Sequence, residues 1–229
     1  MYVELKNINK NFGDYKASDN VNFGVEKGKL IGLLGPSGSG KTTILRMIAG
    51  LETPDSGDII IDGVRVNDIA ASKRGIGFVF QNYALFRYMT VYDNIAFGLR
   101  VQKADKKKID ERVRELIKLI GLEGLEKRYP SQLSGGQRQA LTLMMATFNP
   151  PKLLLLDEHT AALDPGTAEK VLELTKKIVS ENNLTCLMIT HNMQSALELG
   201  NRTIMMNGGH IVMDASGEER KNLTVADML

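Results

Sequence analysis

Gly35-Pro-Ser-Gly-Ser-Gly-Lys41-Thr42 is the stretch that decides the fold of this 229-residue chain. It fits the pattern G-x-x-x-x-G-K-[ST], in which glycines let backbone N–H groups converge on a phosphate. The apolar run 29–34 before it predicts a buried strand, and 43–51 after it has apolar residues at helical spacing with Gly50 as a stop signal. The helix dipole adds positive charge at the same point. This context favours a phosphate-binding loop over a Gly/Ser-rich surface loop that binds nothing.

The composition is that of an ordinary globular protein, with 43% hydrophobic and 24% charged residues. The net charge of +2 is too small to predict a nucleic-acid partner or binding to an anionic membrane. The opening Met1–Lys6 resembles a strand rather than a signal peptide, and apolar runs such as Leu153–Leu156 are too short to span a bilayer. Cys186, the single cysteine, lies in a predicted core strand. We therefore expect a cytoplasmic protein without direct membrane insertion, whose membrane role would require a partner.

Strands and helices alternate in the second half of the chain, which is typical of right-handed βαβ units and a mostly parallel sheet. The front half predicts short strands and then a helical region. The expected strands are 57–63, 75–80, 153–156 and 185–190, the expected helices are 105–121, 137–148, 165–180 and 194–199, and a hairpin is expected over 203–213 with Asn207-Gly208 as its turn.

Polar groups follow directly on four of these apolar strands: the loop from Gly35, then Gln81, Asp157-Glu158 and His191. In open α/β sheets, ligands bind outside the carboxyl ends of the strands. The sequence thus predicts a nucleotide site at one edge. Asp157 is placed to hold Mg²⁺ through water, and Glu158 to orient or deprotonate an attacking water. A helix N-cap is the other interpretation of this acidic pair, and the upstream glycine loop favours the catalytic one.

Leu133-Ser-Gly-Gly-Gln137 matches the signature of ABC ATPases. On its own it would be a Ser/Gly turn before a helix. Together with the four groups above and Ala162-Leu-Asp164, all in the family's order, it makes the chain resemble ABC ATPases over essentially its whole length.

The resemblance implies an α/β fold of the P-loop NTPase type. It would have a RecA-like core with a mostly parallel sheet, an N-terminal antiparallel β-subdomain and a helical subdomain insertion. We expect one ABC ATPase domain over 1–229, in which 1–86 and 138–229 form the catalytic core with the β-subdomain and 87–137 form the helical signature subdomain.

The resemblance also implies roles for individual residues. Lys41 would reach the β- and γ-phosphates, Gln81 would link Mg²⁺ to the helical subdomain, and His191 would contact the γ-phosphate and the attacking water. Phe12 stands where the family stacks a ring on adenine, with Tyr15 as a rival, and either could instead be a packed ring. The implied catalytic residues are Glu158, His191, Lys41 and Gln81, the metal residues are Thr42, Gln81 and Asp157, and the ATP-binding residues are Phe12, Gly35, Pro36, Ser37, Gly38, Ser39, Gly40, Lys41, Thr42, Thr43, Gln81, Asp157, His191, Ser134, Gly135, Gly136 and Gln137.

The implied activity is hydrolysis of ATP to ADP and phosphate with Mg²⁺. In the ATP-bound homodimer, Ser134–Gly136 of one chain would cap the γ-phosphate held by the other, and Leu163-Asp164 would let the two sites sense each other. The dimer would work beneath transmembrane permease subunits at the inner face of a bacterial membrane, most simply in an importer. Alternatives are a DNA-repair or chromosome-organising ATPase, a translation-factor ATPase, a small-molecule P-loop kinase, or a soluble protein without a physiological partner.

Two parts of the chain resemble different importer ATPases. Gln81–Phe86 and Met89–Gly98 are similar to sulfate or molybdate importer ATPases. Asp157–Asp164 has His159 where most of the family has Pro, and resembles a group that is unassigned or linked to aromatic amino acids. We therefore predict a mosaic, natural or engineered, joined near Gln137. Its weakest packing is expected where the helix 137–148 meets the front strands.

Overall fold

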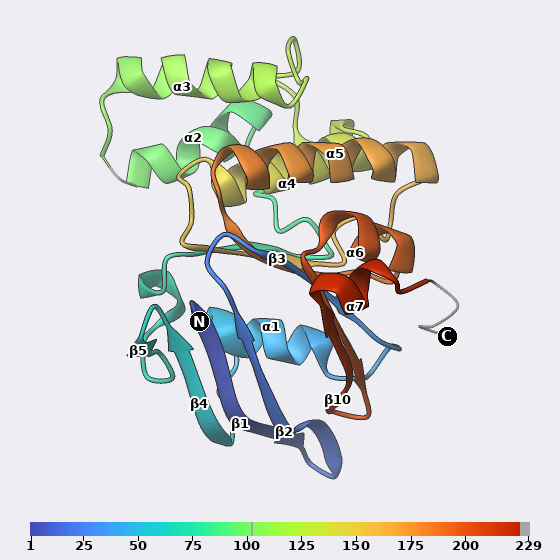
Figure 1. The fold of residues 1–229 in the computed structure, drawn as a ribbon. Coiled ribbons are helices and arrows are strands. Elements are labelled where there is room, and N and C mark those ends of the chain that lie inside the picture. The colour runs from blue at the N-terminus through green and yellow to red at the C-terminus, as the bar shows by residue number, and fades with distance from the viewer. Residues whose placement is uncertain (102, 225–229) are drawn as a thin grey trace.

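The computed structural model describes residues 1–101 and 103–224. A four-stranded antiparallel sheet and a six-stranded, mainly parallel sheet form two layers, with helix α1 (Lys41–Ala49) between them (Figure 1). Helices α2 to α5 cover the other face of the larger sheet (Figure 1). The predicted fold class, a parallel core with an antiparallel β-subdomain and added helices, is confirmed.

The larger sheet has neighbouring strands in the order β10-β9-β3-β8-β7-β6. All neighbouring pairs are parallel except β10 with β9, which is antiparallel. Every residue of its three central strands is buried, as expected for a sheet covered on both faces. The strands are β3 (Leu30–Leu34), β6 (Ile76–Val79), β7 (Leu153–Asp157), β8 (Thr185–Ile189), β9 (Arg202–Asn207) and β10 (His210–Ser216).

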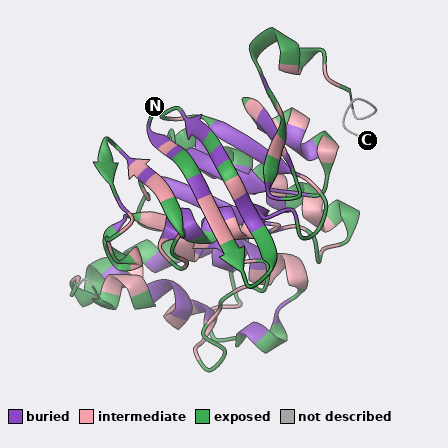
Figure 2. Ribbon diagram, turned by 90° about the horizontal axis from the view of Figure 1, so that it is seen from below, coloured by how far each residue is buried: buried purple, intermediate pink, exposed green. Residues whose placement is uncertain are grey.

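The smaller sheet has the order β2-β1-β4-β5 and is entirely antiparallel. Buried and exposed residues alternate over short stretches of β1 (Val3–Phe12) and β2 (Tyr15–Val25) (Figure 2). One face of this sheet therefore packs against the core. These two strands are longer than the short strands that the sequence predicted. The remaining strands are β4 (Ser56–Ile61) and β5 (Val64–Arg65).

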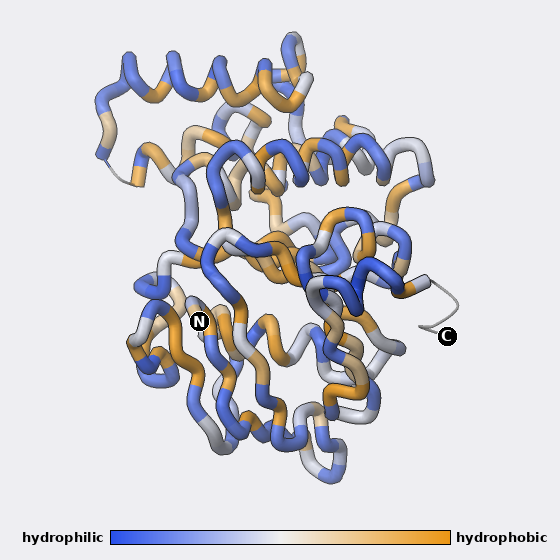
Figure 3. The backbone as a smooth tube through the Cα atoms, viewed as in Figure 1, coloured by the Kyte–Doolittle hydropathy of each residue, from blue (hydrophilic) through white to orange (hydrophobic). Residues whose placement is uncertain are grey.

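Two hydrophobic cores lie on opposite faces of the larger sheet. Leu153 and Leu155 point into the core shared with α1 and the antiparallel sheet, whereas Leu154 and Leu156 point into the core beneath the helices. Successive side chains of a strand face opposite sides, so the run of four leucines serves both cores. The central strands are accordingly the most continuously hydrophobic part of the trace, and α3 is hydrophilic along its outer side (Figure 3).

Four helices begin at a polar cap that the sequence provides. The side chains of Asp105, Ser134, Asp164 and Asn192 accept hydrogen bonds from the first backbone N–H groups of α3, α4, α5 and α6. Among the described residues, no helix combines the length and apolar character that crossing a bilayer requires. The helices are α2 (Val91–Val101), α3 (Lys106–Leu119), α4 (Gly135–Thr147), α5 (Pro165–Glu181), α6 (Met193–Leu199) and α7 (Gly217–Lys221), with 3-10 turns at Ala71–Lys73 and Pro130–Gln132.

The predicted turn of the last hairpin was wrong by one residue. Asn207 still pairs with His210, so the two turn residues are Gly208 and Gly209. Both have positive φ, of 53° and 82°. A two-residue hairpin turn of this kind favours glycine at both positions, which explains why the turn moves past Asn207.

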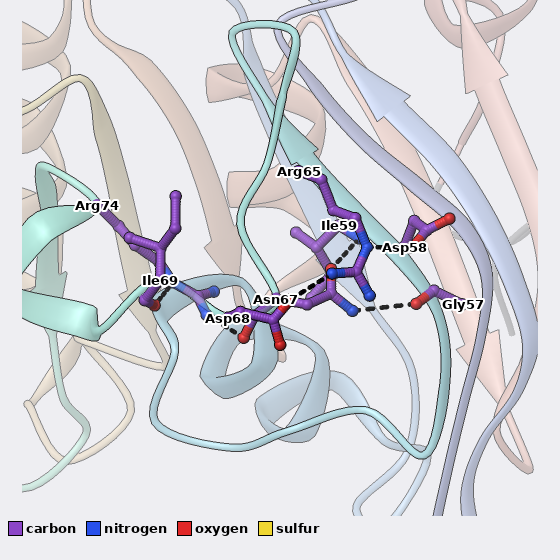
Figure 4. A network of polar contacts seen from close by, with 8 residues as sticks. All are labelled: Gly57, Asp58, Ile59, Arg65, Asn67, Asp68, Ile69 and Arg74. Carbon is purple, nitrogen blue, oxygen red and sulfur yellow. Dashed lines mark hydrogen bonds and ion pairs between the residues drawn. The ribbon is translucent and has the colours of Figure 1, made fainter.

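The loop after β5 is tied down by polar contacts (Figure 4). Asn67 bridges β4, accepting from Ile59 N at 2.9 Å and donating to Gly57 O at 3.0 Å. The Arg74 guanidinium is buried and donates to Ile69 O at 2.8 Å, and it also reaches the last carbonyls of α1. Burial lowers the pKa of Arg74, since its partners are neutral carbonyls rather than carboxylates. This arginine therefore closes the C-terminal end of α1.

A surface groove of about 520 Å³ runs where α4 meets β6. Its lining includes Phe78 of β6, and Met145 and Phe148 at the end of α4. The backbones approach closely beside it, because a Cβ added to Gly77 would lie 2.4 Å from the Ala146 carbonyl oxygen. This is the contact at which the sequence predicted weak packing, and the gain from repacking it stays a prediction.

Candidate nucleotide-binding site

The glycine loop is wedged between two strands that come from opposite ends of the chain. A Cβ added to Gly35, which has φ of 140°, would lie 2.1 Å from the Met206 carbonyl oxygen of β9. At Gly40, with φ of 95°, it would lie 1.9 Å from the Ala17 carbonyl oxygen of β2. Only glycine allows both the conformation and the close approach. Neither Met206 nor Ala17 was predicted, because the pattern of the loop says nothing about which distant backbone lies against it.

Lys41 is the first residue of α1, and its side chain folds back over the loop. Its Nζ donates to the carbonyl oxygens of Gly35 and Pro36, both at 2.8 Å, and lies 3.3 Å from Ser39 Oγ. Burial lowers the pKa of Lys41, and nearby carboxylates act in the opposite direction. The ammonium group is thus held at the centre of the loop by neutral oxygens that a phosphate oxygen can replace.

Thr42 and Asp157 meet at the base of the site. Thr42 Oγ1 donates to Asp157 Oδ1 at 3.0 Å, joining α1 to the end of β7. Burial raises the pKa of Asp157, and the hydrogen bond from Thr42 opposes that shift. A hydroxyl and a carboxylate oxygen are hard donors of the kind that Mg²⁺ takes, so these residues fit the ion that the sequence implied.

The Glu158 carboxylate lies between the side chains of His191 and Gln81, two of the other predicted site residues. Its Oε1 lies 2.6 Å from His191 Nε2, and its Oε2 accepts from Gln81 Nε2 at 3.0 Å. The Glu158 side chain is 14% exposed. Its backbone has φ of 49°, and its N–H donates to Ile189 O at 3.1 Å. The four neighbouring strands β3, β8, β7 and β6 therefore deliver the loop, His191, Asp157 with Glu158, and Gln81 to one edge, as predicted.

Gln81 differs in one respect from its expected metal role. Its amide contacts Glu158, and no hydrogen bond among the described residues joins it to Thr42 or Asp157. The metal role of Gln81 stays a prediction.

The signature residues lie apart from the phosphate loop of their own chain. Ser134 Oγ accepts from Gln137 N at 3.2 Å, and Gln137 Oε1 accepts from Ser134 N at 2.9 Å, forming a capping box on α4. A Cβ added to Gly136 would lie 2.3 Å from Thr167 Cγ2 of α5, so α4 packs directly on α5. Within the described residues, no hydrogen bond connects the signature with the loop 35–42. One chain alone does not bring these two motifs together.

The two side chains that could stack on adenine make different contacts. The Phe12 ring, at the end of β1, is 47% exposed, and Lys10 Nζ lies 5.1 Å from its centroid. The Tyr15 hydroxyl, at the start of β2, donates to the Gly38 carbonyl of the phosphate loop. Tyr15 is as exposed as Phe12, at 48%, but its hydroxyl is engaged in holding the loop, whereas the Phe12 ring makes no contact with the loop among the described residues.

In the sequence, His159 stands out only because most of the family has Pro at this position. It is 3% exposed, and its Nε2 lies 3.0 Å from Thr175 Oγ1. Burial lowers the pKa of His159 to about 4, so the ring is neutral at physiological pH. No local pattern could have predicted this contact, because Thr175 lies on α5, beyond the intervening loop.

The family whose sequence model matches residues 18–161 is described as ABC transporter. The sulfate/thiosulfate import ATP-binding protein CysA of Synechocystis sp. is 48% identical over 219 residues, covering 96% of this chain and 62% of its own length. The protein of that name from Pseudomonas aeruginosa is 45% identical over 227 residues, covering 97% of this chain and 69% of its own. The chain thus spans less than two thirds of the length of the first relative and slightly more than two thirds of the second. Since both alignments extend across Gln137, they lend no support to a mosaic joined there.

Solved structures of the same shape exist. The ATP-binding cassette MJ0796, solved as a dimer in a post-hydrolysis state bound to ADP and Pi, has a TM-score of 0.84 and 33% identity, covering 93% of this chain and 98% of its own. A further dimeric structure of MJ0796, named as a bacterial ABC transporter cassette, has a TM-score of 0.84 and 32% identity.

Proposed function

The chain belongs to the ABC transporter family, and from that premise we propose that it is the ATP-hydrolysing subunit of a bacterial importer. The observation that carries the proposal is the position of the Glu158 carboxylate. It lies between Gln81 and His191, on the residue next to the Thr42–Asp157 pair. A carboxylate beside a phosphate loop and a Mg²⁺-type oxygen pair is the arrangement that hydrolysis of a nucleoside triphosphate requires.

ATP would bind with its phosphates in the loop from Gly35 to Thr43. Lys41 Nζ would exchange its two carbonyl partners for phosphate oxygens, which form stronger, charge-assisted hydrogen bonds. Phe12 would stack on adenine, because the two rings are about equally exposed and the Tyr15 ring is held to the loop through its hydroxyl. A bound Mg²⁺, held by Thr42 and Asp157 with Gln81 nearby, would neutralise charge on the β- and γ-phosphates.

Glu158 would act as the general base. A carboxylate has about four lone-pair sites, so its two present contacts leave room for a water molecule. The carboxylate would take a proton from that water as the water oxygen bonds to the γ-phosphorus. The bond from phosphorus to the bridging oxygen breaks, and its electron pair remains on ADP. His191, whose Nε2 lies 2.6 Å from Glu158 Oε1, would orient the carboxylate and the γ-phosphate that is cleaved from ATP.

The composite site would form between two copies of the chain. The signature residues Ser134 to Gly136 do not reach the loop of their own chain, and the similar cassette MJ0796 was solved as a dimer. The N-terminus of α4 has backbone N–H groups and a dipole suited to a γ-phosphate from a partner. We therefore propose a head-to-tail dimer in the ATP-bound state.

Permease subunits would dock on the helical subdomain. Tyr88 is 96% exposed, and the ring of Phe86 contacts the ring of Phe97 on α2 in a tilted arrangement, with centroids 4.5 Å apart and both residues partly exposed. Exposed aromatic side chains are enriched where proteins meet. The relatives named above are sulfate/thiosulfate import proteins, and we propose the same oxyanion class as cargo, with the dimer at the cytoplasmic face of the membrane.

Two measurements test this function. Phosphate release from Mg²⁺-ATP should rise per monomer with protein concentration, because each site needs two chains. When the subunit is reconstituted with a sulfate permease in vesicles, ATP-dependent uptake of sulfate should appear and uptake of an aromatic amino acid should not. Hydrolysis by a proven monomer at a concentration-independent rate would refute the composite site, and uptake of the amino acid alone would reassign the cargo.

A further inference from the structure

His159 directly follows the proposed base, and its ring makes a buried hydrogen bond to α5. The Thr175 hydroxyl is fully buried and donates its single proton to the Val171 carbonyl at 2.8 Å. Its oxygen can therefore only accept from the ring nitrogen that lies 3.0 Å away. With the hydroxyl proton directed at Val171, the contact is made by the neutral His159 tautomer that carries its proton on Nε2.

This contact anchors a loop that has few other anchors. Between Glu158 and the cap residue Asp164, His159 has the only side chain that hydrogen-bonds, within the part of the chain that the structure describes. On the other side of the loop's first residue, Glu158 N–H donates to Ile189 O at 3.1 Å. Glu158 is thus fixed from both directions, by its own backbone to β8 and by its neighbour's ring to α5.

The backbone of Glu158 needs such fixing, because its φ of 49° is a conformation that side-chain-bearing residues rarely adopt. Strained residues persist only where the surrounding structure determines them. If this backbone relaxed to negative φ, the carboxylate would turn away from Gln81 and His191, which hold it at 3.0 and 2.6 Å.

We propose that His159 is a positioning residue for Glu158: its hydrogen bond to Thr175 holds the start of the loop so that the carboxylate stays between Gln81 and His191. The inference rests on the proposed function, since it gives His159 a role in hydrolysis. It does not extend to nucleotide binding, because no hydrogen bond or ion pair among the described residues joins the phosphate loop or the Thr42–Asp157 pair to His159 or Thr175.

Thr175 offers a matched pair of variants. Thr175→Val keeps the shape of the side chain and removes the hydroxyl, whereas Thr175→Ser keeps the hydroxyl and removes a methyl group. We expect Thr175→Val to lower kcat by at least about tenfold, because misplacing a catalytic group by about 1 Å can cost 10²-fold. KM for ATP and the Kd for a non-hydrolysable analogue should stay within about twofold of wild type, and Thr175→Ser should restore kcat.

A second variant guards against misfolding. Thr175→Val leaves a buried ring N–H without an acceptor and can lower the melting temperature. His159→Phe fills the same space without a donor, and should show the same selective loss of kcat at a melting temperature near that of wild type. If His159→Phe keeps full kcat, or if Thr175→Ser loses as much as Thr175→Val, the role is one of packing and the proposal is overturned.

The background of Glu158→Gln separates this proposal from the function on which it rests. If Thr175 acts through Glu158, adding Thr175→Val to Glu158→Gln should not lower the residual rate further. A further loss by the same factor overturns the positioning role. A different result would refute the proposed function: the single variant Glu158→Gln would hydrolyse ATP at the wild-type rate.

Discussion

Glu158→Gln removes the proposed base while leaving its surroundings nearly intact. In the folded protein, Glu158 meets one donor, Gln81 Nε2, and one ring nitrogen, His191 Nε2. A glutamine amide can accept from Gln81 with its oxygen and donate to His191 with its nitrogen, because a neutral imidazole can leave Nε2 unprotonated. Both contacts survive, so the free energy of unfolding should change by less than about 1 kcal/mol.

The rate should change far more. Positioned general bases contribute about 10²- to 10⁴-fold, which is roughly 2.7 to 5.4 kcal/mol of activation free energy at 1.36 kcal/mol per tenfold. ATP affinity should be unchanged, and an ATP-dependent dimer should accumulate because bound ATP is no longer consumed. Phosphate release, calorimetric binding and light scattering measure the three quantities. A variant that keeps the wild-type rate would refute the assignment and make His191 the next candidate for the base.

Further predictions concern binding, assembly and folding. Lys41→Ala should weaken ATP binding by about 2–3 kcal/mol in calorimetry, since charge-assisted contacts to phosphate are lost; unchanged affinity would contradict the phosphate-loop assignment. Mixing inactive Ser134→Arg subunits with inactive Lys41→Ala subunits should restore hydrolysis through one intact composite site per heterodimer, and mixtures that stay inactive while dimerising would argue against sharing in trans. Phe12→Ala should cost about 1–3 kcal/mol of ATP affinity by loss of stacking, and Tyr15→Phe about 0.5–1.5 kcal/mol by loss of one hydrogen bond to the loop; unchanged affinity in Phe12→Ala, with a loss in Tyr15→Ala that exceeds the loss in Tyr15→Phe, would give the adenine to Tyr15. Arg74→Ala should lower the free energy of unfolding by about 2–4 kcal/mol in denaturant titration, because the carbonyls of Met47, Ile48 and Ile69 each lose a charged donor, and a loss below about 0.5 kcal/mol would mean that water replaces the guanidinium.

The edge that carries the site could be predicted because each of its groups directly follows an apolar run in sequence. Strand periodicity and the rule that ligands bind at the carboxyl ends of parallel strands were enough to place Gln81, Asp157 and His191 together. Helix stops such as Gly50 were also predictable, since a left-handed C-cap favours glycine; its φ is 78°.

What escaped the sequence depends on contacts between distant segments. The Met206 carbonyl against Gly35, the Tyr15 hydroxyl on the loop and the His159 ring on α5 all join residues whose local patterns are unremarkable. Helix α7 was missed because it is short and none of its residues is buried; α2, which Thr90 caps by accepting from Asp93 N, was covered only by the general expectation of a helical subdomain. The departure at His159 was visible in the sequence, but its hydrogen-bond partner was not.

Helix α5 contacts two separate motifs of the chain. Thr167 packs against Gly136 of the signature, and the Thr175 hydroxyl lies 3.0 Å from the ring of His159, the residue next to Glu158. The two threonines are eight residues apart, roughly 12 Å along a helix that rises 1.5 Å per residue. In the proposed head-to-tail dimer, Gly136 would serve the partner's ATP and Glu158 the chain's own. Helix α5 would then join the two nucleotide sites through one rigid element, so a shift of the signature would be transmitted to the residue beside the base.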